Sequence, residues 1–257
     1  RVLFRSASVT GTKTFVGRVT VGATGNWNNT GNEAVVFRGG ITNNGTFSAG
    51  TGIHTFNTNS QSIYGTLVIP TISITAPTVV TNYGTITCAT SFTGTGGFTQ
   101  AANSTLNLGG TATVTTQTMN AVPNLVNYYG AVAQTVRPVA YYNLTLQGGG
   151  IKTLTGVSTI NNDLTLAGTA TATTAIAMNI GRNLIIGNGT TFTAAGFSLT
   201  VNGTTTVGNG ASGRLTISSA TGTKTFVGLV TLNNGAIWTN TAANSPVSFR
   251  GGITNSG

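Results

Sequence analysis

Four residues of this 257-residue chain carry side chains from which catalytic or metal sites are usually built. They are Glu33, His54, Cys88 and Asp163, and the chain has no other acid, histidine or cysteine. Two carboxyl groups that share acid–base or glycosidase chemistry must lie within ~5–10 Å of each other. Because Glu33 and Asp163 lie in distant parts of the sequence, we expect no such pair. The sequence predicts no catalytic residues and no enzymatic activity.

The single histidine and the single cysteine both lie in segments typical of strands. His54 occurs in GIHTFN and Cys88 in TITCAT. One histidine and one cysteine do not supply the usual number of ligands for a metal ion, and one cysteine forms no internal disulfide. We therefore expect no metal site and no cofactor. We expect a structural histidine and a cysteine that behaves as a small buried apolar residue.

The charge balance is strongly basic but dilute. Eleven Lys and Arg oppose two acids, which gives a net charge of +9, while charged residues make up only 5% of the chain. This balance favours anionic partners such as acidic glycans. The basic residues form no cluster, so no specific nucleic-acid partner is expected. No apolar run approaches the ~18 residues of a membrane helix, so no membrane span is expected either.

A long repeat organises the chain. The segment GTKTFVGRVTVG…FRGGITNNG (11–45) returns as GTKTFVGLVTLN…FRGGITNSG (222–257). The offset is 211 residues, and it becomes 212 after one insertion. A tandem array is predicted, with residues 11–221 as one full unit and 222–257 as the opening of the next. Its structural repeat positions pair Lys13 with Lys224, Trp27 with Trp238 and Arg38 with Arg250.

A shorter repeat predicts the fold. The segments NLTLQG, DLTLAG, NLIIGN and SLTVNG begin at residues 143, 163, 183 and 198. Alternating apolar residues indicate half-buried strands, and the closing glycines indicate bends. Spacings of about 20, 20 and 15 residues match coils of a β-solenoid. We predict an all-β, parallel β-solenoid of about a dozen coils, forming a single continuous domain over residues 1–257.

The short repeat also gives Asp163 a role. Asp163 takes the position that Asn143, Asn183 and Ser198 take in the other segments. Side chains of these types bond to the backbone in turns. A structural turn position is therefore predicted, in place of a catalytic one.

All three lysines of the chain lie in copies of one motif. Lys13, Lys152 and Lys224 each precede a threonine and then Phe or Leu, and a glycine follows. Alternation places each lysine on the same side of a strand as that Phe or Leu. Either each lysine lies at a corner, with its stem packed and its amine in water, or the neighbouring Phe and Leu face outward, and we expect the corner.

One stretch departs from the coil pattern. Residues 123–144 concentrate aromatic and basic side chains: Tyr128, Tyr129, Arg137, Tyr141 and Tyr142. Exposed tyrosines beside arginine suit sugar rings, so this stretch is the predicted surface or glycan contact. The alternative is an oversized corner that packs on its own coil. Threonine-rich segments such as TATVTTQT (111–118) hold no fixed position in the short repeat, so a threonine-lined flat face is not predicted.

The segments AQTV…YYNLTLQGGGIKTLTG…RNLIIGNGTTF…LTVNG (133–203) and GGITNNGTFSAGTG (39–52) resemble the repetitive surface adhesins of Bacteroidota, including those of gliding or type IX-secreting species. The resemblance implies a secreted, extracellular stalk on the cell surface that mediates attachment, without catalytic residues. Its partners would be neighbouring copies of the repeat in the same chain, other chains in fibres, and anionic or glycan surfaces. The alternative function is a carbohydrate- or surface-binding module acting through residues 123–144.

Overall fold

The computed structural model describes residues 3–5, 11–209 and 212–257. The described residues contain parallel strands and no helix, and the strands stack into a β-solenoid of about twelve turns. The predicted fold class is confirmed. The chain divides into two compact units, Arg1–Asn124 and Leu125–Gly257, so a single continuous domain stays a prediction.

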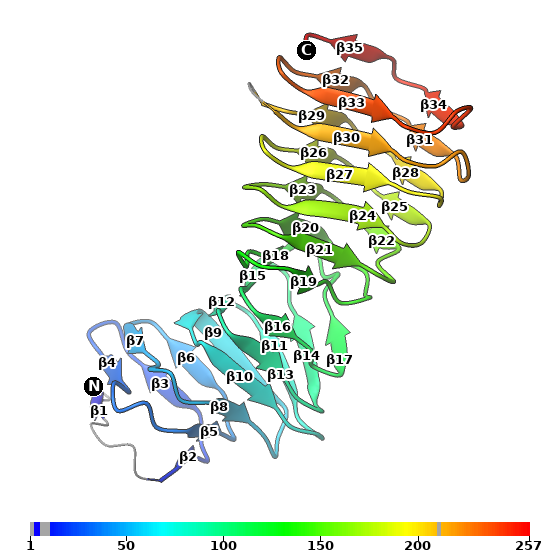
Figure 1. Cartoon of the computed structure of the whole chain (residues 1–257). Coiled ribbons are helices and arrows are strands. Elements are labelled where there is room, and N and C mark those ends of the chain that lie inside the picture. The colour runs from blue at the N-terminus through cyan, green and yellow to red at the C-terminus, as the bar shows by residue number, and fades with distance from the viewer. Residues whose placement is uncertain (1–2, 6–10, 210–211) are drawn as a thin grey trace. The chain divides into compact units, whose positions relative to one another are not determined.

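In the first unit, each solenoid turn adds a parallel strand to a sheet (Figure 1). The first sheet contains β1 (Leu3–Arg5), β4 (Asn26–Asn28) and β7 (Thr46–Ser48). The second contains β2 (Lys13–Phe15), β5 (Val35–Phe37), β8 (His54–Phe56), β10 (Thr71–Ile74), β13 (Ser91–Thr93) and β16 (Thr111–Ala112). The third includes β3 (Val19–Val21), β6 (Ile41–Asn43), β9 (Gln61–Val68), β11 (Val79–Asn82), β14 (Gly97–Gln100), β17 (Thr116–Thr118), β12 (Thr85–Cys88) and β15 (Ser104–Leu108).

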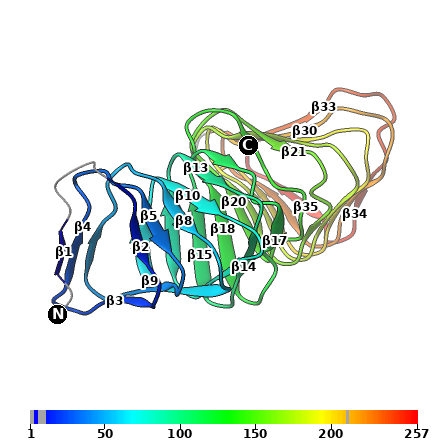
Figure 2. The same ribbon diagram turned by 90° about the horizontal axis from the view of Figure 1, so that it is seen from below.

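The second unit is more regular, because from β20 onward each full turn contributes one strand to each of three sheets (Figures 1 and 2). One sheet includes β18 (Asn124–Tyr128), β20 (Asn143–Leu146), β23 (Leu164–Leu166), β26 (Leu184–Ile186), β29 (Thr205–Val207), β32 (Val230–Leu232) and β35 (Ile253–Asn255). The next contains β19 (Gln134–Thr135), β21 (Ile151–Leu154), β24 (Thr171–Thr174), β27 (Thr191–Ala194), β30 (Arg214–Ile217) and β33 (Ile237–Asn240). The last contains β22 (Thr159–Ile160), β25 (Met178–Ile180), β28 (Leu199–Val201), β31 (Lys224–Phe226) and β34 (Val247–Phe249).

Ladders of like apolar residues form the core of the second unit. Leu146 pairs with Leu166, Leu166 with Ile186, and Ile186 with Val207. All four side chains are fully buried. Burying a side chain of this size contributes about 1.5–3 kcal/mol, so each added turn supplies its own share of the core.

The segment of the short repeat that begins at Ser198 lies in a different sheet from the other three segments. The segments beginning at 143, 163 and 183 form β20, β23 and β26 of one sheet. The segment beginning at Ser198 forms β28, which pairs with β25 and β31 in another sheet. The residue that follows Leu184 in its ladder is Thr205. The prediction that Ser198 begins a new coil was therefore wrong, because the chain from Asn183 to Ser198 completes only part of a turn.

The polar residue before each strand of this sheet bonds to the next turn. Asn143 Oδ1 accepts a hydrogen bond from the amide of Asp163 (3.3 Å), and Asp163 Oδ1 accepts one from the amide of Asn183 (3.0 Å). Asn183 Oδ1 in turn accepts from the amide of Thr204 (3.0 Å). The backbone-bonding role predicted for Asp163 is confirmed, although Thr204 rather than Ser198 continues the series.

Candidate functional site

Both carboxylates of the chain lie beside a cation within their own unit. Glu33 Oε1 is 3.0 Å from Lys13 Nζ, and the Glu33 side chain is 1% exposed. Asp163 Oδ2 is 3.7 Å from Arg182 Nη1 near the surface. Each acid therefore has an electrostatic partner and a place in the packing of its own turn, which is a structural arrangement.

The histidine and the cysteine are buried in strands of the first unit. His54 is fully buried, its ring stacks on Phe37 with centroids 6.1 Å apart, and its Nδ1 lies 2.9 Å from the carbonyl oxygen of Gly52. Burial lowers the pKa of His54 to about 4, so the ring is neutral at pH 7 and Nδ1 donates to that carbonyl. Burial raises the pKa of Cys88 to about 11. The predictions of a structural histidine and a buried cysteine are confirmed. Within the described residues, no three His, Cys, Asp or Glu gather where they could hold a metal ion.

The lysine motif places its amines inside the solenoid. Lys152 and Lys224 are fully buried at inward strand positions. Lys152 Nζ donates to the Gly130 carbonyl (2.7 Å) and to Gln134 Oε1 (2.7 Å). Lys224 Nζ donates to the carbonyls of Thr221 and Gly222, both at 2.6 Å.

The predicted corner with its amine in water was therefore wrong for these two lysines. Alternation correctly placed each lysine on the side of the following Leu or Phe, but that side faces the core. Backbone carbonyls of the bend satisfy the buried ammonium group, while burial lowers the pKa of both lysines. Lys13 is the exception, because its side chain is 39% exposed and contacts Glu33.

The tyrosine-rich stretch packs on its own turn. Tyr128 and Tyr141 are fully buried, and their hydroxyls lie 3.3 Å apart. Tyr128 Oη accepts a hydrogen bond from the Arg137 amide (3.1 Å), and Tyr141 Oη donates to the Arg137 carbonyl (2.8 Å). Burial raises the pKa of both phenols. The predicted surface role was wrong for these two residues, whereas Tyr129, Tyr142 and Arg137 are half-buried at the surface.

A column of threonines runs across one sheet of the second unit. The residues pair in sequence across six adjacent strands, from β19 to β33, which lie side by side in Figure 1. They are Thr135, Thr153, Thr173, Thr193, Thr216 and Thr239. The first five alternate with buried residues and therefore face outward, and Thr239 is half-buried in the last strand of the series. The column contains no residue of the segment 111–118, whose strands β16 and β17 lie in other sheets, so the expectation of no fixed position holds for that segment, whereas the expectation of no threonine-lined face was wrong.

This threonine column presents a flat, nearly uncharged surface. Neighbouring strands of a sheet lie ~4.8 Å apart, so hydroxyl and methyl groups recur at that spacing. The adjacent outward column contains Ile151, Thr171, Thr191, Arg214 and Ile237. Arg214 is the one charged residue in these paired positions, and its Nη1 donates to Thr239 Oγ1 (3.1 Å).

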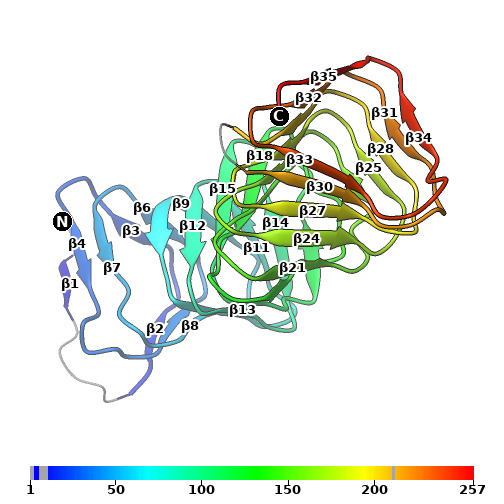
Figure 3. The same ribbon diagram turned by 45° about the horizontal axis from the view of Figure 1, so that its top comes forward.

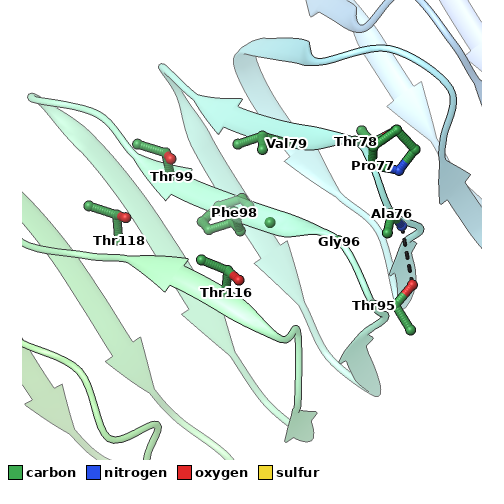
Figure 4. Close-up of a pocket in the computed structure, with 11 residues that line it drawn as sticks. Ala76, Pro77, Thr78, Val79, Thr95, Gly96, Phe98, Thr99, Thr116 and Thr118 are labelled. Carbon is green, nitrogen blue, oxygen red and sulfur yellow. Dashed lines mark hydrogen bonds between the residues drawn. The ribbon is translucent and has the colours of Figure 1, made fainter.

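The first unit has a shallow, threonine-lined depression of about 230 Å³ (Figure 4). Thr99 of β14 and Thr116 and Thr118 of β17 line it, together with Pro77 from the bend between β10 and β11 and Thr95 from the bend between β13 and β14. Gly97, which has no side chain, adds to the open space. No lining residue has an acidic, basic or thiol side chain, so the depression offers only hydroxyl, backbone and apolar groups.

An aromatic stack lies on the surface of the first unit. The rings of Tyr64 and Tyr83 are nearly parallel (7°), with centroids 4.9 Å apart. The guanidinium of Arg18 lies 5.1 Å from the Tyr64 ring centroid, and its Nη1 donates to Thr42 (3.3 Å). Tyr83 is 49% exposed. The interval from Tyr64 to Tyr83 is close to one turn of the short repeat, and this is the signal by which the sequence could have revealed the stack.

No protein-family model, curated protein or solved structure matches this chain significantly. Among the described residues there is no helix whose length and apolar character would allow it to cross a membrane.

Proposed function

We propose that this protein is a non-enzymatic structural and adhesive component of an extracellular, cell-surface stalk or fibre that mediates attachment. The threonine column of the second unit is the observation that carries the proposal, because it is a flat outward surface repeated over six strands. The parallel ladders beneath it supply stiffness without dependence on charge. The resemblance of residues 133–203 to Bacteroidota surface adhesins agrees with this function and with secretion to the cell surface.

The test is adhesion of beads coated with the whole chain to an uncharged hydroxylated surface, such as cellulose, under flow. We expect retention above that of beads coated with an inert protein of equal size. Replacing Thr153, Thr173 and Thr193 with lysine should reduce retention at least about threefold, because three charges then interrupt the flat column. The matched control places lysine at Thr145, Thr165 and Thr206, which face outward on another sheet. Equal retention of wild-type and inert beads would refute the proposal.

A second candidate function is binding of acidic polysaccharides. The stack of Arg18, Tyr64 and Tyr83 favours it, because tyrosine faces contact sugar rings and a guanidinium pairs with carboxylates. The excess of eleven cations over two acids acts in the same direction.

Affinity electrophoresis in gels containing alginate or neutral dextran distinguishes the two functions. Arg18→Gln with Tyr83→Ala should strongly reduce retardation by alginate, with a remainder due to the other ten Lys and Arg, and dextran should retard no variant. The comparison variant, Tyr129→Ala with Tyr142→Ala and Arg137→Gln, tests the tyrosine-rich stretch and should keep wild-type retardation. Loss of retardation only in the comparison variant would assign glycan binding to residues 123–144 instead.

A further inference from the structure

The end of the second unit carries a copy of a surface that the first unit covers. The sequence RGGITN occurs at 38–43 and at 250–255, where its last three residues form β6 and β35. β6 pairs with β3 on one side and with β9 on the other. Among the strands that the structure describes, β35 pairs with β32 alone, and it is the outermost strand of its sheet in Figure 3.

The two copies build the same aromatic cluster. In each copy a phenylalanine of the first strand, a tryptophan and a second phenylalanine pack together. In the first copy the ring centroids lie 5.1 Å (Phe15–Trp27), 5.9 Å (Phe15–Phe37) and 5.8 Å (Trp27–Phe37) apart. In the second copy the equivalent distances are 5.5 Å (Phe226–Trp238), 5.7 Å (Phe226–Phe249) and 5.4 Å (Trp238–Phe249). The repeat therefore reproduces a platform, including the positions of its rings.

In the first copy the next turn of the chain, residues 46–65, covers this platform. Phe47 stacks on Trp27 at 5.3 Å, and Phe56 stacks on Phe37 at 5.2 Å. Ile63 pairs with Ile41 in the sheet. As a result Trp27, Phe37 and Ile41 are all 0% exposed.

In the second copy the equivalent surface is open. We define the end face as the outer surface of β33, β34 and β35 (Figure 3). Phe249 is 40% exposed and Ile253 is 49% exposed, although their counterparts Phe37 and Ile41 are fully buried. The end face is therefore apolar where the first copy makes its contacts with the following turn.

A glycine of the end face also fits the same covering turn. Gly40 and Gly252 have the same positive φ of 83°. A Cβ at Gly40 would overlap the Ser62 carbonyl oxygen of the next turn, whereas a Cβ at Gly252 would have nothing within 4 Å. Gln61 of that turn accepts from the Gly40 amide (2.9 Å) and donates to the Phe37 carbonyl (2.8 Å). Glycine at 252 leaves the space that such a strand needs.

We propose that the end face binds a solenoid turn with the sequence of residues 46–65, which adds parallel strands to β33, β34 and β35. Exposed strand edges accept further strands in this way, and the apolar side chains select the register. Phe47, Phe56 and Ile63 of the bound turn contact Trp238, Phe249 and Ile253. Gln61 bonds to the Gly252 amide and the Phe249 carbonyl. This interaction joins the opening segment of a repeat to the turn that follows it, and it does not depend on the proposed adhesion.

The test is a chain in which residues 46–68 are fused directly after Gly257, the equivalent of Gly45. The Gly252 carbonyl and the Ser256 amide bond to β32. Because successive residues of a strand direct their backbone groups to opposite sides, the amides of Ile253 and Asn255 point to the open edge. In the extended chain we expect these two amides to exchange hydrogen at least about tenfold more slowly than in the 257-residue chain. Equal exchange rates in the two chains would overturn the proposal.

Two variants separate specific docking from a general effect of added residues. An extension that carries Phe47→Asn, Phe56→Asn and Ile63→Asn should give no protection. Gly252→Ala should abolish the protection in the extended chain, because the new Cβ meets the docked strand. Because Gly252 has a φ of 83°, alanine also strains the backbone there. The loss is assigned to docking when the 257-residue chain with Gly252→Ala keeps the bond from the Val230 amide to the Gly252 carbonyl (3.1 Å). Protection that survives either change would also overturn the proposal.

Discussion

The two copies of the long repeat share their sequence and their strand pairing but differ in burial. Lys13 pairs with Val35 in the first copy as Lys224 pairs with Val247 in the second. Phe37 is nevertheless 0% exposed and Phe249 is 40% exposed. The strands and their register are therefore encoded within the repeat, whereas burial of its apolar residues depends on the neighbouring turns. This is the behaviour expected of a fold in which each repeat contacts only its neighbours.

The copies also differ in the groups that the ammonium group of the motif's lysine contacts. Lys13 contacts the buried carboxylate of Glu33, and the second copy has the uncharged residues 242–244 in that region. Lys224 donates instead to two backbone carbonyls. The lysine does not require an acid, because the bend itself supplies acceptors for its ammonium group.

We expect the two copies to differ most in the stability lost when the second phenylalanine of the aromatic cluster, Phe37 or Phe249, is replaced with alanine. Phe37→Ala should destabilise the first unit by about 3–5 kcal/mol, because it leaves a cavity in a closed core. Phe249→Ala should cost the second unit about 1–2 kcal/mol, since part of that ring already contacts solvent. Urea unfolding followed by hydrogen-exchange mass spectrometry measures each unit separately. Equal losses would mean that the following turn contributes nothing to the burial of Phe37.

The strands and their stacking could be predicted because the signal for them is local. Alternating residues such as those of NLTLQG and DLTLAG place leucines inward, and the polar residue before each strand bonds to the next turn. The threonine column could not be read in the same way. Its members recur at unequal intervals because the bends differ in length, so no fixed spacing marks them.

The side chains that were wrongly placed share a physical reason. Lys152, Lys224, Tyr128 and Tyr141 are polar, and polarity predicts exposure unless a buried partner is available. In each case the partner is a backbone group or a second buried side chain contributed by a bend or a neighbouring turn. Sequence patterns report which side a residue faces. They do not report which carbonyls or hydroxyls a bend brings within reach of that residue.

Acid should destabilise the first unit more than the second. The folded state lowers the pKa of His54 from 6.5 to about 4, so between these values the unfolded chain binds a proton that the folded chain does not. The stability contributed by neutral His54 is fully present above pH 6.5. It is lost as the pH falls to about 4, by up to about 3 kcal/mol.

Hydrogen exchange measured between about pH 7 and pH 4, corrected for the intrinsic exchange rate, checks this dependence in strands β5 and β8. The second unit contains no histidine and serves as the internal reference. His54→Phe should remove the pH dependence while keeping a ring against Phe37. A first unit that loses no more stability than the second over this range would contradict the assignment to His54.

The smallest effect concerns the lysine that has an acid partner. Lys13→Met leaves the Glu33 carboxylate, which is 1% exposed, without its cation. Removing one member of a buried pair costs about 3–5 kcal/mol, and we expect about 2 kcal/mol here because Lys13 itself is 39% exposed. Adding Glu33→Gln should recover most of that loss in urea unfolding, since no uncompensated charge then remains. If the double variant is as unstable as Lys13→Met, the lysine stem contributes through packing, and the two copies of the motif differ less in their electrostatics than the Lys13–Glu33 contact implies.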